Sequence, residues 1–249
     1  MRGTFVIASR EIRAFFVSPM AYVVLTVWAL WSGLSYYFFA SLYAMNGSSG
    51  GTDNPLSSFF GGTILFFLPQ LVFVPVLTMR LLADERRTGS IELLLTAPVS
   101  EVSVVMGKYL AAMTFWIALW LPSLLYVWIT SRFGSVDMGT VGASYLGILG
   151  IGFYNMAIGL LASALARNQI IAAVMTFFFL GGLFLLGIGQ YVFMNATRDI
   201  LAYLSVWSHM QDFSKGIVDS RDLVYDLSIS ALALFLAVRA LAARRDEAA

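Results

Sequence analysis

The sequence lacks cysteine, carries a single histidine and has few charged residues. Without cysteine there can be no disulfide, no thiol nucleophile and no cysteine-ligated metal. His209 alone cannot form a histidine cluster for metal binding or proton relay. Charged residues make up 12% of the chain, about half the share of a soluble domain, and the net charge is only +1. This balance excludes an ordinary soluble domain and gives no indication of a nucleic-acid partner.

Sequence signatures of catalysis are also missing. A phosphate-binding loop has the pattern GxxxxGK followed by Ser or Thr, so it needs a second Gly five residues before the Gly that precedes Lys. Here Tyr109 follows Gly107-Lys108, and Val102 stands where that earlier Gly would be. Neither a zinc-protease helix motif nor a GxSxG nucleophile turn is present. We therefore expect no catalytic site, cofactor or metal ion in this chain.

Long apolar runs dominate what remains. A helix needs about 20 mostly apolar residues to cross the hydrocarbon core of a bilayer. Six stretches meet this requirement, at about 19–42, 57–79, 108–130, 141–165, 169–190 and 223–243. They lack the period-2 alternation of barrel strands, and backbone groups in lipid must pair within the segment. The sequence therefore predicts an all-α polytopic membrane protein, with one transmembrane domain over residues 1–249.

The distribution of basic residues predicts the orientation of these spans. Positive charges collect in cytoplasmic connections. If the N-terminus is cytoplasmic, eleven of the 15 Lys and Arg residues lie on the cytoplasmic side, and the outer side has only Arg132, Arg198, Lys215 and Arg221. We therefore expect both termini in the cytoplasm.

Two segments outside the spans have amphipathic patterns. In residues 1–16 the apolar side chains recur every three to four positions, and basic side chains occupy another sector; the apolar set is Phe5, Ala8, Ile12, Phe15 and Phe16. This pattern predicts an elbow helix in the inner membrane interface, which either only fixes the topology or also contacts a partner. A similar spacing within 191–222 predicts outer interfacial helices; its apolar residues are Ile200, Leu201, Tyr203, Leu204, Trp207 and Met210.

The charged segment, RLLADERRTGSIELLLTAPVS at 80–100, interrupts the apolar runs. Its charges at membrane depth would cost about 10 kcal/mol, so we place it in the cytoplasm between the second and third spans. A short helix there offers Ile91, Leu94 and Leu95 to a groove on a partner, Gly89 lets the backbone turn, and Pro98 ends the helix. The alternative is a solvated turn that only satisfies the positive-inside rule.

Polar residues inside the spans are few. Gln70, Tyr154 and Asn155 could face a transport pathway, but hydrogen bonding between helices explains them at least as well. An ion-driven carrier normally holds ionisable groups at mid-membrane, and none is obvious here. The pattern therefore disfavours an ion-coupled carrier.

Three stretches resemble the membrane subunit of ABC-2 type transporters, more narrowly the permeases of gliding motility and nitrous-oxide respiration. They are REIRAFFVSPMAYVV (10–24), RLLADERRTGSIELLLTAPVSEVSVVMGKYLA (80–111) and GIVDSRDLVYDLSISALALFL (216–236). The resemblance implies that residues 81–98 form a coupling helix that docks on a separate ATPase subunit. Carried onto this chain, the ATPase-coupling residues are Asp84, Glu85, Arg86, Arg87, Thr88, Gly89, Ile91, Glu92, Leu94 and Leu95.

The resemblance also implies partners and a place in the cell. We expect an ABC ATPase subunit that binds ATP and Mg, a second permease copy or sister permease, and an accessory extracytoplasmic subunit, all at the bacterial inner membrane. The expected function is that of an export-type permease without its own ATPase. A membrane scaffold that transmits force without bulk transport is the alternative, and a channel or carrier that needs no ATPase is a third possibility.

Overall fold

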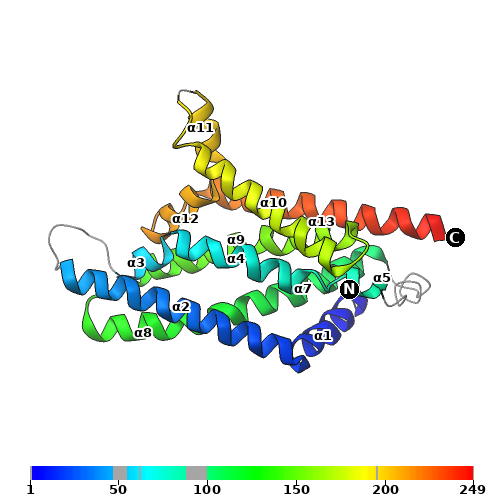
Figure 1. The fold of residues 1–249 in the computed structure, drawn as a ribbon, viewed down its shortest axis with the longest axis horizontal. Coiled ribbons are helices and arrows are strands. Elements are labelled where there is room, and N and C mark those ends of the chain that lie inside the picture. The colour runs from blue at the N-terminus through cyan, green and yellow to red at the C-terminus, as the bar shows by residue number, and fades with distance from the viewer. Residues whose placement is uncertain (1, 47–54, 62, 88–99, 195, 249) are drawn as a thin grey trace.

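The protein is a bundle of helices (Figure 1). The computed structural model describes residues 2–46, 55–61, 63–87, 100–194 and 196–248, and no strand occurs among them. Six helical segments are long and apolar enough to cross a bilayer: Pro19–Met45, Ile64–Glu85, Glu101–Phe133, Met138–Leu165, Gln169–Gly189 and Ser220–Ala243. The predicted all-α polytopic fold with six spans is therefore confirmed.

The helices divide the chain more finely than the apolar runs do. Their bounds are α1 Arg2–Val17, α2 Pro19–Asn46, α3 Pro55–Phe60, α4 Ile64–Thr78, α5 Ala83–Arg87, α7 Glu101–Trp120, α8 Ser123–Phe133, α9 Met138–Leu165, α10 Gln169–Gly189, α11 Ala196–Tyr203, α12 Val206–Ser214 and α13 Ser220–Ala248. The predicted span 57–79 begins inside the short helix α3 and continues through α4. The predicted span 108–130 begins well inside α7 and continues into α8.

Local chemistry explains these boundaries. Ser100 accepts a hydrogen bond from the backbone N–H of Ser103 at 3.3 Å and so caps the start of α7, seven residues before the predicted start of the span. The break between α7 and α8 falls at Pro122, which has no N–H to continue the ladder of hydrogen bonds. Ser205 likewise caps α12 through the N–H of Ser208 and divides the outer segment into α11 and α12.

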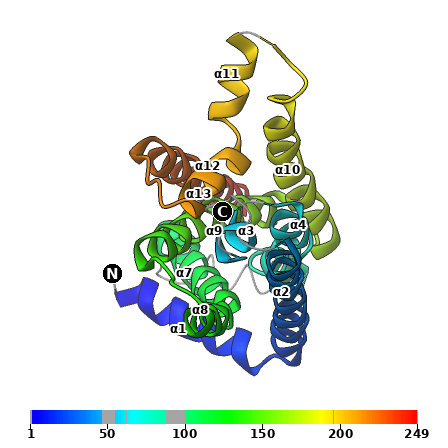
Figure 2. The ribbon, with the colours of Figure 1, turned by 90° about the vertical axis from the view of Figure 1, so that its left-hand side faces the viewer.

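Helix α9 is the centre of the bundle and packs against α4, α7, α10, α12 and α13 (Figure 2). Glycines on α9 let these neighbours approach closely, because a side chain at each of them would overlap a residue of another helix. The facing pairs are Gly147 with Phe213, Gly150 with Asp226, Gly152 with Trp116 and Gly159 with Thr78. The central helix is thus surrounded at short range by α12, α13, α7 and α4 in turn.

The two ends of the bundle differ. Helices α1 and α5 and the C-terminal end of α13 lie at one end, so both termini are on the same side (Figure 1). Helix α12 lies toward the other end, and α11 projects away from the bundle beyond the end of α10. The end that holds α1 and α5 is the one where the charged segment begins.

Helix α1 runs at an angle to the spans and packs along α7. Its Phe15 and Phe16 rings lie 5.4 and 5.6 Å from the ring of Phe115. The buried face overlaps the predicted one, since Ala8 is buried and Phe15 and Phe16 contact Phe115, but it includes Ile7 and leaves Phe5 exposed. Helix α1 therefore has apolar side chains both on the face that packs against protein and on a neighbouring face that remains exposed. Its apolar surface is wider than the single stripe that the sequence pattern predicts.

Candidate functional site

The charged segment begins at α5, and a side chain of the central helix holds its start. Ser163 of α9 accepts hydrogen bonds from the backbone N–H groups of Leu82 and Ala83, both at 3.0 Å. Its hydroxyl lies 3.3 Å from the carbonyl of Met79, to which it donates. The first N–H groups of a helix have no partner within the helix, so Ser163 supplies one from a distant part of the chain. The start of the charged segment is thereby fixed to α9.

Helix α10 is hydrogen-bonded to Asp84, the second residue of α5. The side-chain amide of Gln169, the first residue of α10, donates to Asp84 Oδ1 at 2.5 Å. Asn168 caps the same helix by accepting from the N–H of Ile171 at 2.9 Å. Asp84 therefore connects α5 to the beginning of the fifth span.

A cluster of four charged residues joins α5 to α1 and α7. Lys108 of α7 is 1% exposed, and its Nζ lies 2.8 Å from Glu85 Oε1 and 3.3 Å from Glu11 Oε1. Arg10 Nη2 lies 2.9 Å from Glu11 Oε1 and 3.7 Å from Glu85 Oε1. The hydrogen bond to Glu11 raises the pKa of Arg10 above its usual value. We call Arg10, Glu11, Glu85 and Lys108 the ion-pair node; its two positive and two negative charges balance.

A glycine makes the node possible. A Cβ at Gly107 would lie 2.8 Å from Ile7 Cγ2 and 3.1 Å from the carbonyl oxygen of Thr4. Only a residue without a side chain lets α1 approach α7 this closely. Thr4, Ile7 and Glu11 follow each other at helical spacing on one face of α1, so the close contact brings Glu11 to Lys108.

Burial makes the node behave as one unit. An ammonium taken out of water is tolerated only while its counter-charges stay in place, and removing one partner leaves an uncompensated charge. Lys108 is nearly inaccessible, so it favours arrangements in which Glu11 and Glu85 both remain beside it. Helix α5 is therefore attached to α1 and α7 through the node, and to α9 and α10 through Ser163 and Gln169.

The predicted ATPase-coupling residues fall into three groups. Asp84 and Glu85 lie in α5 and make the internal contacts given above. Arg86 and Arg87 complete α5. The remaining six lie outside the described residues, and their docking role stays a prediction; they are Thr88, Gly89, Ile91, Glu92, Leu94 and Leu95.

The three polar residues singled out within the spans lie together in the interior. Gln70 of α4 and Asn155 of α9 are 3% and 4% exposed, and the Asn155 amide donates to Gln70 Oε1 at 3.1 Å. Gln70 in turn donates to the carbonyl of Phe66. Tyr154 is buried beside them, and the cavity that these residues line measures about 30 Å³, which is room for about one water molecule. The arrangement is that of a hydrogen bond between two packed helices.

Sequence reasoning missed the roles of Glu11, Lys108, Ser163 and Gln169. Lys108 is the first residue of the predicted span 108–130, whereas α7 begins at Glu101 and carries Lys108 two turns inside the helix. The sequence feature that could have indicated this role is a single lysine next to a glycine within an otherwise apolar stretch. Glu11 carried a similar signal, because it is the only acidic residue of α1.

A second buried ionisable residue lies toward the other end of the bundle. Asp226 of α13 is 2% exposed, and its Oδ1 has no hydrogen-bond partner among the described residues. It lies six residues after the start of α13, about 9 Å along the helix, and so closer to the helix end than to its middle. One turn earlier, Asp222 Oδ1 lies 3.4 Å from His209 Nε2 of α12. In the sequence, Asp226 lies near the beginning of the predicted span 223–243.

Taken together, the fold and this site define a polytopic α-helical membrane protein with a charged segment anchored to four helices at one end. The family model described as "ABC-2 family transporter protein" matches residues 41–238. The chain therefore belongs to the ABC-2 family of transporter proteins and is a permease subunit of an ABC transporter, which is not itself the catalytic component. Membership implies an ABC ATPase partner and typically a dimer. A comparison with curated proteins gave no match.

Proposed function

We propose that this permease couples ATP hydrolysis by a separate ATPase subunit to export, with residues 81–98 as the coupling helix. The observation that supports this proposal most directly is the attachment of α5 to α1, α7, α9 and α10 by buried polar contacts. A connection that served only as a solvated turn would not need a buried lysine and a serine from the central helix to hold it. Such anchoring suits an element that must carry force into the spans.

In this mechanism, ATP binding moves the ATPase subunits, and the docked segment moves with them. The contacts of α5 with α1, α7, α9 and α10 carry that movement to the cytoplasmic ends of these four helices. The helices then tilt together as rigid bodies, and the bundle does not deform locally. Two such chains, either identical or sister subunits, face each other, and the path for the substrate opens between them. The permease thus shifts between two packed states. ATP favours one of them because it binds more tightly to the closed form of the ATPase.

The orientation and the narrower assignment belong to the same proposal. Eleven of 15 basic residues favour a cytoplasmic location for both termini, and α1, α5 and the end of α13 lie at a common end of the molecule. The three motif stretches support the gliding-motility and nitrous-oxide type of bacterial inner-membrane permease. An accessory extracytoplasmic subunit would then recognise the substrate.

Docking and transmission can be tested separately. Reversing the charge of Glu85 would break its internal ion pair with Lys108, so that change cannot isolate docking. The double variant Leu94→Ala, Leu95→Ala removes two apolar docking groups and leaves the four residues of the node unchanged in sequence. Co-purification with the ABC ATPase partner should fall at least about tenfold, which corresponds to the loss of about 1.4 kcal/mol of binding free energy.

The matched variant is Lys108→Met, which leaves residues 88–99 unchanged. It should retain the ATPase on the column but lower the stimulation of ATP hydrolysis by the permease at least about threefold, because the node no longer transmits movement. If the leucine variant still binds the ATPase at the wild-type level, residues 81–98 are not the docking element. ATPase binding without any transport of cargo in reconstituted vesicles would favour the scaffold alternative.

A further inference from the structure

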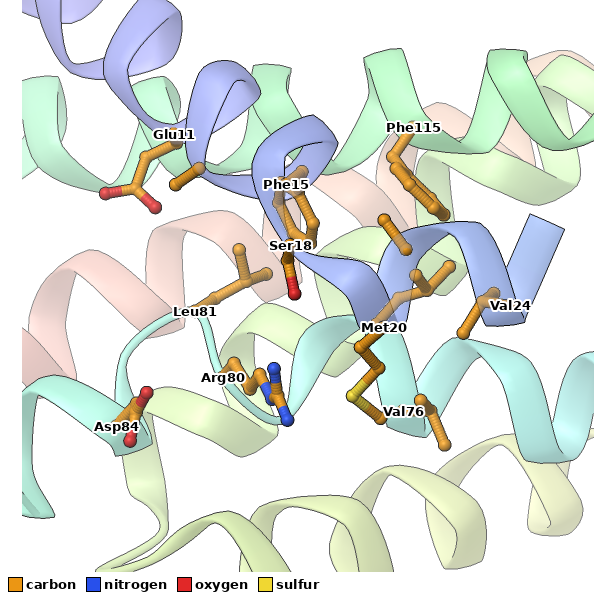
Figure 3. A pocket seen from close by; sticks show the side chains of 13 residues that line it. Glu11, Phe15, Ser18, Met20, Val24, Val76, Arg80, Leu81, Asp84 and Phe115 are labelled. Atoms are coloured by element: carbon orange, nitrogen blue, oxygen red, sulfur yellow. The ribbon is translucent and has the colours of Figure 1, made fainter.

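Two acidic side chains at the end of the bundle that holds α5 are bound by other residues. Figure 3 shows Glu11 and Asp84, which both line a cavity of about 330 Å³ there. Lys108 is ion-paired with Glu11, and Gln169 donates a hydrogen bond to Asp84. Asp226, toward the other end, differs from both, because its side chain has no hydrogen bond or ion pair with any residue that the structure describes.

The carboxyl group of Asp226 is enclosed by protein. The residue is 2% exposed, and its Oδ1 has no partner. A Cβ at Gly150 would overlap Oδ2, so the carboxyl group lies directly against the backbone of α9. A hydrated metal ion does not fit between the two residues, and the described residues contain no group of three or more His, Asp and Glu side chains that could hold one.

The titratable groups around Asp226 give it no counter-charge. They are Asp222 and Tyr225 of α13, Tyr154 of α9, His209 of α12 next to Asp222, and Tyr109 of α7, which lies beside Ser230 one turn further along α13. Of these groups only His209 can become cationic, and its Nε2 lies 3.4 Å from Asp222 Oδ1 and 3.0 Å from the carbonyl oxygen of Tyr203. A charge on His209 therefore balances Asp222 and not Asp226.

These surroundings favour the neutral form of the carboxyl group. An ionised Asp226 would be a buried charge without a counter-charge, and the neutral acid avoids most of that cost. Asp222, one turn away, is a second acidic group that would repel the charge. A bound proton removes the charge and needs no additional volume, so it is the ligand that fits this closely packed position.

We propose that Asp226 is a proton-binding site, which is occupied while α13 is packed against α9 and emptied when water enters between the two helices. The residue lies about 9 Å along α13 from its beginning. Its proton therefore exchanges with the solution at the end of the bundle that holds α12, and a movement that wets this contact releases one proton per chain. The site lies within this chain and does not depend on the ATPase, so its test is independent of the proposed function.

The direct test is infrared spectroscopy of the purified full-length chain in a maltoside detergent, which has no ester or acid C=O group of its own. The C=O stretch of a protonated carboxyl group should be present at about pH 7, where an ordinary aspartate is ionised. Asp226→Asn should lose an intensity equal to one carboxyl group per chain. Asp219→Asn is the matched control and should lose none, because Asp219 precedes α13 and an asparagine oxygen can still accept from the N–H of Arg221 at 2.8 Å.

The pH dependence of thermal unfolding gives a second readout. A group that holds a proton in the folded state stabilises the fold at low pH, and this contribution is lost as the pH rises and the group ionises. Between about pH 7 and about pH 9, the unfolding midpoint of the wild type should therefore fall at least about 3 °C further than that of Asp226→Asn. Asparagine resembles the neutral acid in size, so this variant should be as stable as the wild type at about pH 7.

Four results would each overturn the proposal. They are an unchanged carboxyl band in Asp226→Asn, the same pH response in this variant and the wild type, a less stable Asp226→Asn at about pH 7, and stabilisation of the wild type by sodium chloride over choline chloride that disappears in Asp226→Asn. The last result would identify the ligand as a metal cation and not a proton.

Discussion

At the scale of single residues, the buried ammonium of Lys108 is the most demanding group in the structure. It is surrounded by protein and lies between two carboxylates that come from different helices. A buried group of paired charges adds little net stability compared with apolar side chains of the same total volume, because the desolvation of the charges offsets most of their Coulomb attraction. What it does provide is a fixed relation among α1, α5 and α7.

We predict that Lys108→Met lowers the free energy of unfolding by about 3 kcal/mol, because Glu11 and Glu85 lose the charge that balances them. The triple variant Glu11→Gln, Glu85→Gln, Lys108→Met should recover most of this loss, since the charge that then loses its partners is that of Arg10, whose side chain is 60% exposed to solvent. Both can be measured as equilibrium unfolding in mixed micelles. A single variant as stable as the wild type would mean that water reaches the two carboxylates and the node is not desolvated.

The sequence indicated which residues are charged but not which of them are paired. Asp84 and Glu85 could be placed in the charged segment because its composition contrasts with that of the flanking spans. Their partners Gln169, Lys108 and Arg10 are 85, 23 and 75 positions away along the chain. Side-chain periodicity describes one helix at a time, so it cannot predict a contact that depends on how two helices cross.

At the scale of elements, the glycines of α9 decide how tightly the bundle closes. Gly152 faces the indole of Trp116, which is fully buried and donates from Nε1 to the carbonyl of Ile148 at 3.0 Å. A methyl group at 152 has no space unless the indole or the helix moves. Gly181 on α10 has open space around the same position.

Gly152→Ala should therefore destabilise the protein by about 1–3 kcal/mol through overpacking. Gly181→Ala is the matched control and should be neutral or stabilising by up to about 1 kcal/mol, because alanine is the better helix former. Thermal unfolding of both variants in the same detergent compares them directly. Equal midpoints for the two variants would show that α7 adjusts freely around α9.

The number of spans could be predicted because lipid imposes a length and a composition on each crossing helix. Their internal breaks could not. Pro69 and Pro75 lie inside α4 without ending it, whereas Pro122 separates α7 from α8. Whether a proline ends a helix depends on whether neighbouring groups satisfy the freed carbonyl, which is a property of the packed bundle.

At the scale of the whole molecule, α1 and α7 form one body. They are joined by the close contact at Gly107, by the ion-pair node and by the Phe15–Phe115 and Phe16–Phe115 ring contacts. The Cβ of Ile7 lies 2.9 Å from the place a Cβ would take at Gly107, and a disulfide needs about 3.8 Å between these atoms. A shift of about 1 Å accommodates a cross-link there.

The variant Ile7→Cys, Gly107→Cys introduces the only two thiols of the chain, because the native sequence has no cysteine. We predict that oxidation to the disulfide leaves ATPase stimulation within about twofold of the reduced protein, because the two helices move together. The readout is ATP hydrolysis by the purified complex before and after addition of a reductant. Inhibition that the reductant reverses would show that α1 slides along α7 during the cycle.

The position of Lys108 also has a consequence for how the protein is made. Glu11 and Glu85 both precede Lys108 in the sequence, and a nascent chain emerges from its N-terminus. Both counter-charges have therefore been synthesised before the lysine reaches the membrane. The helix that contains Lys108 can be inserted against an acidic surface that already exists, so the ammonium is neutralised as it arrives and is never left alone in lipid.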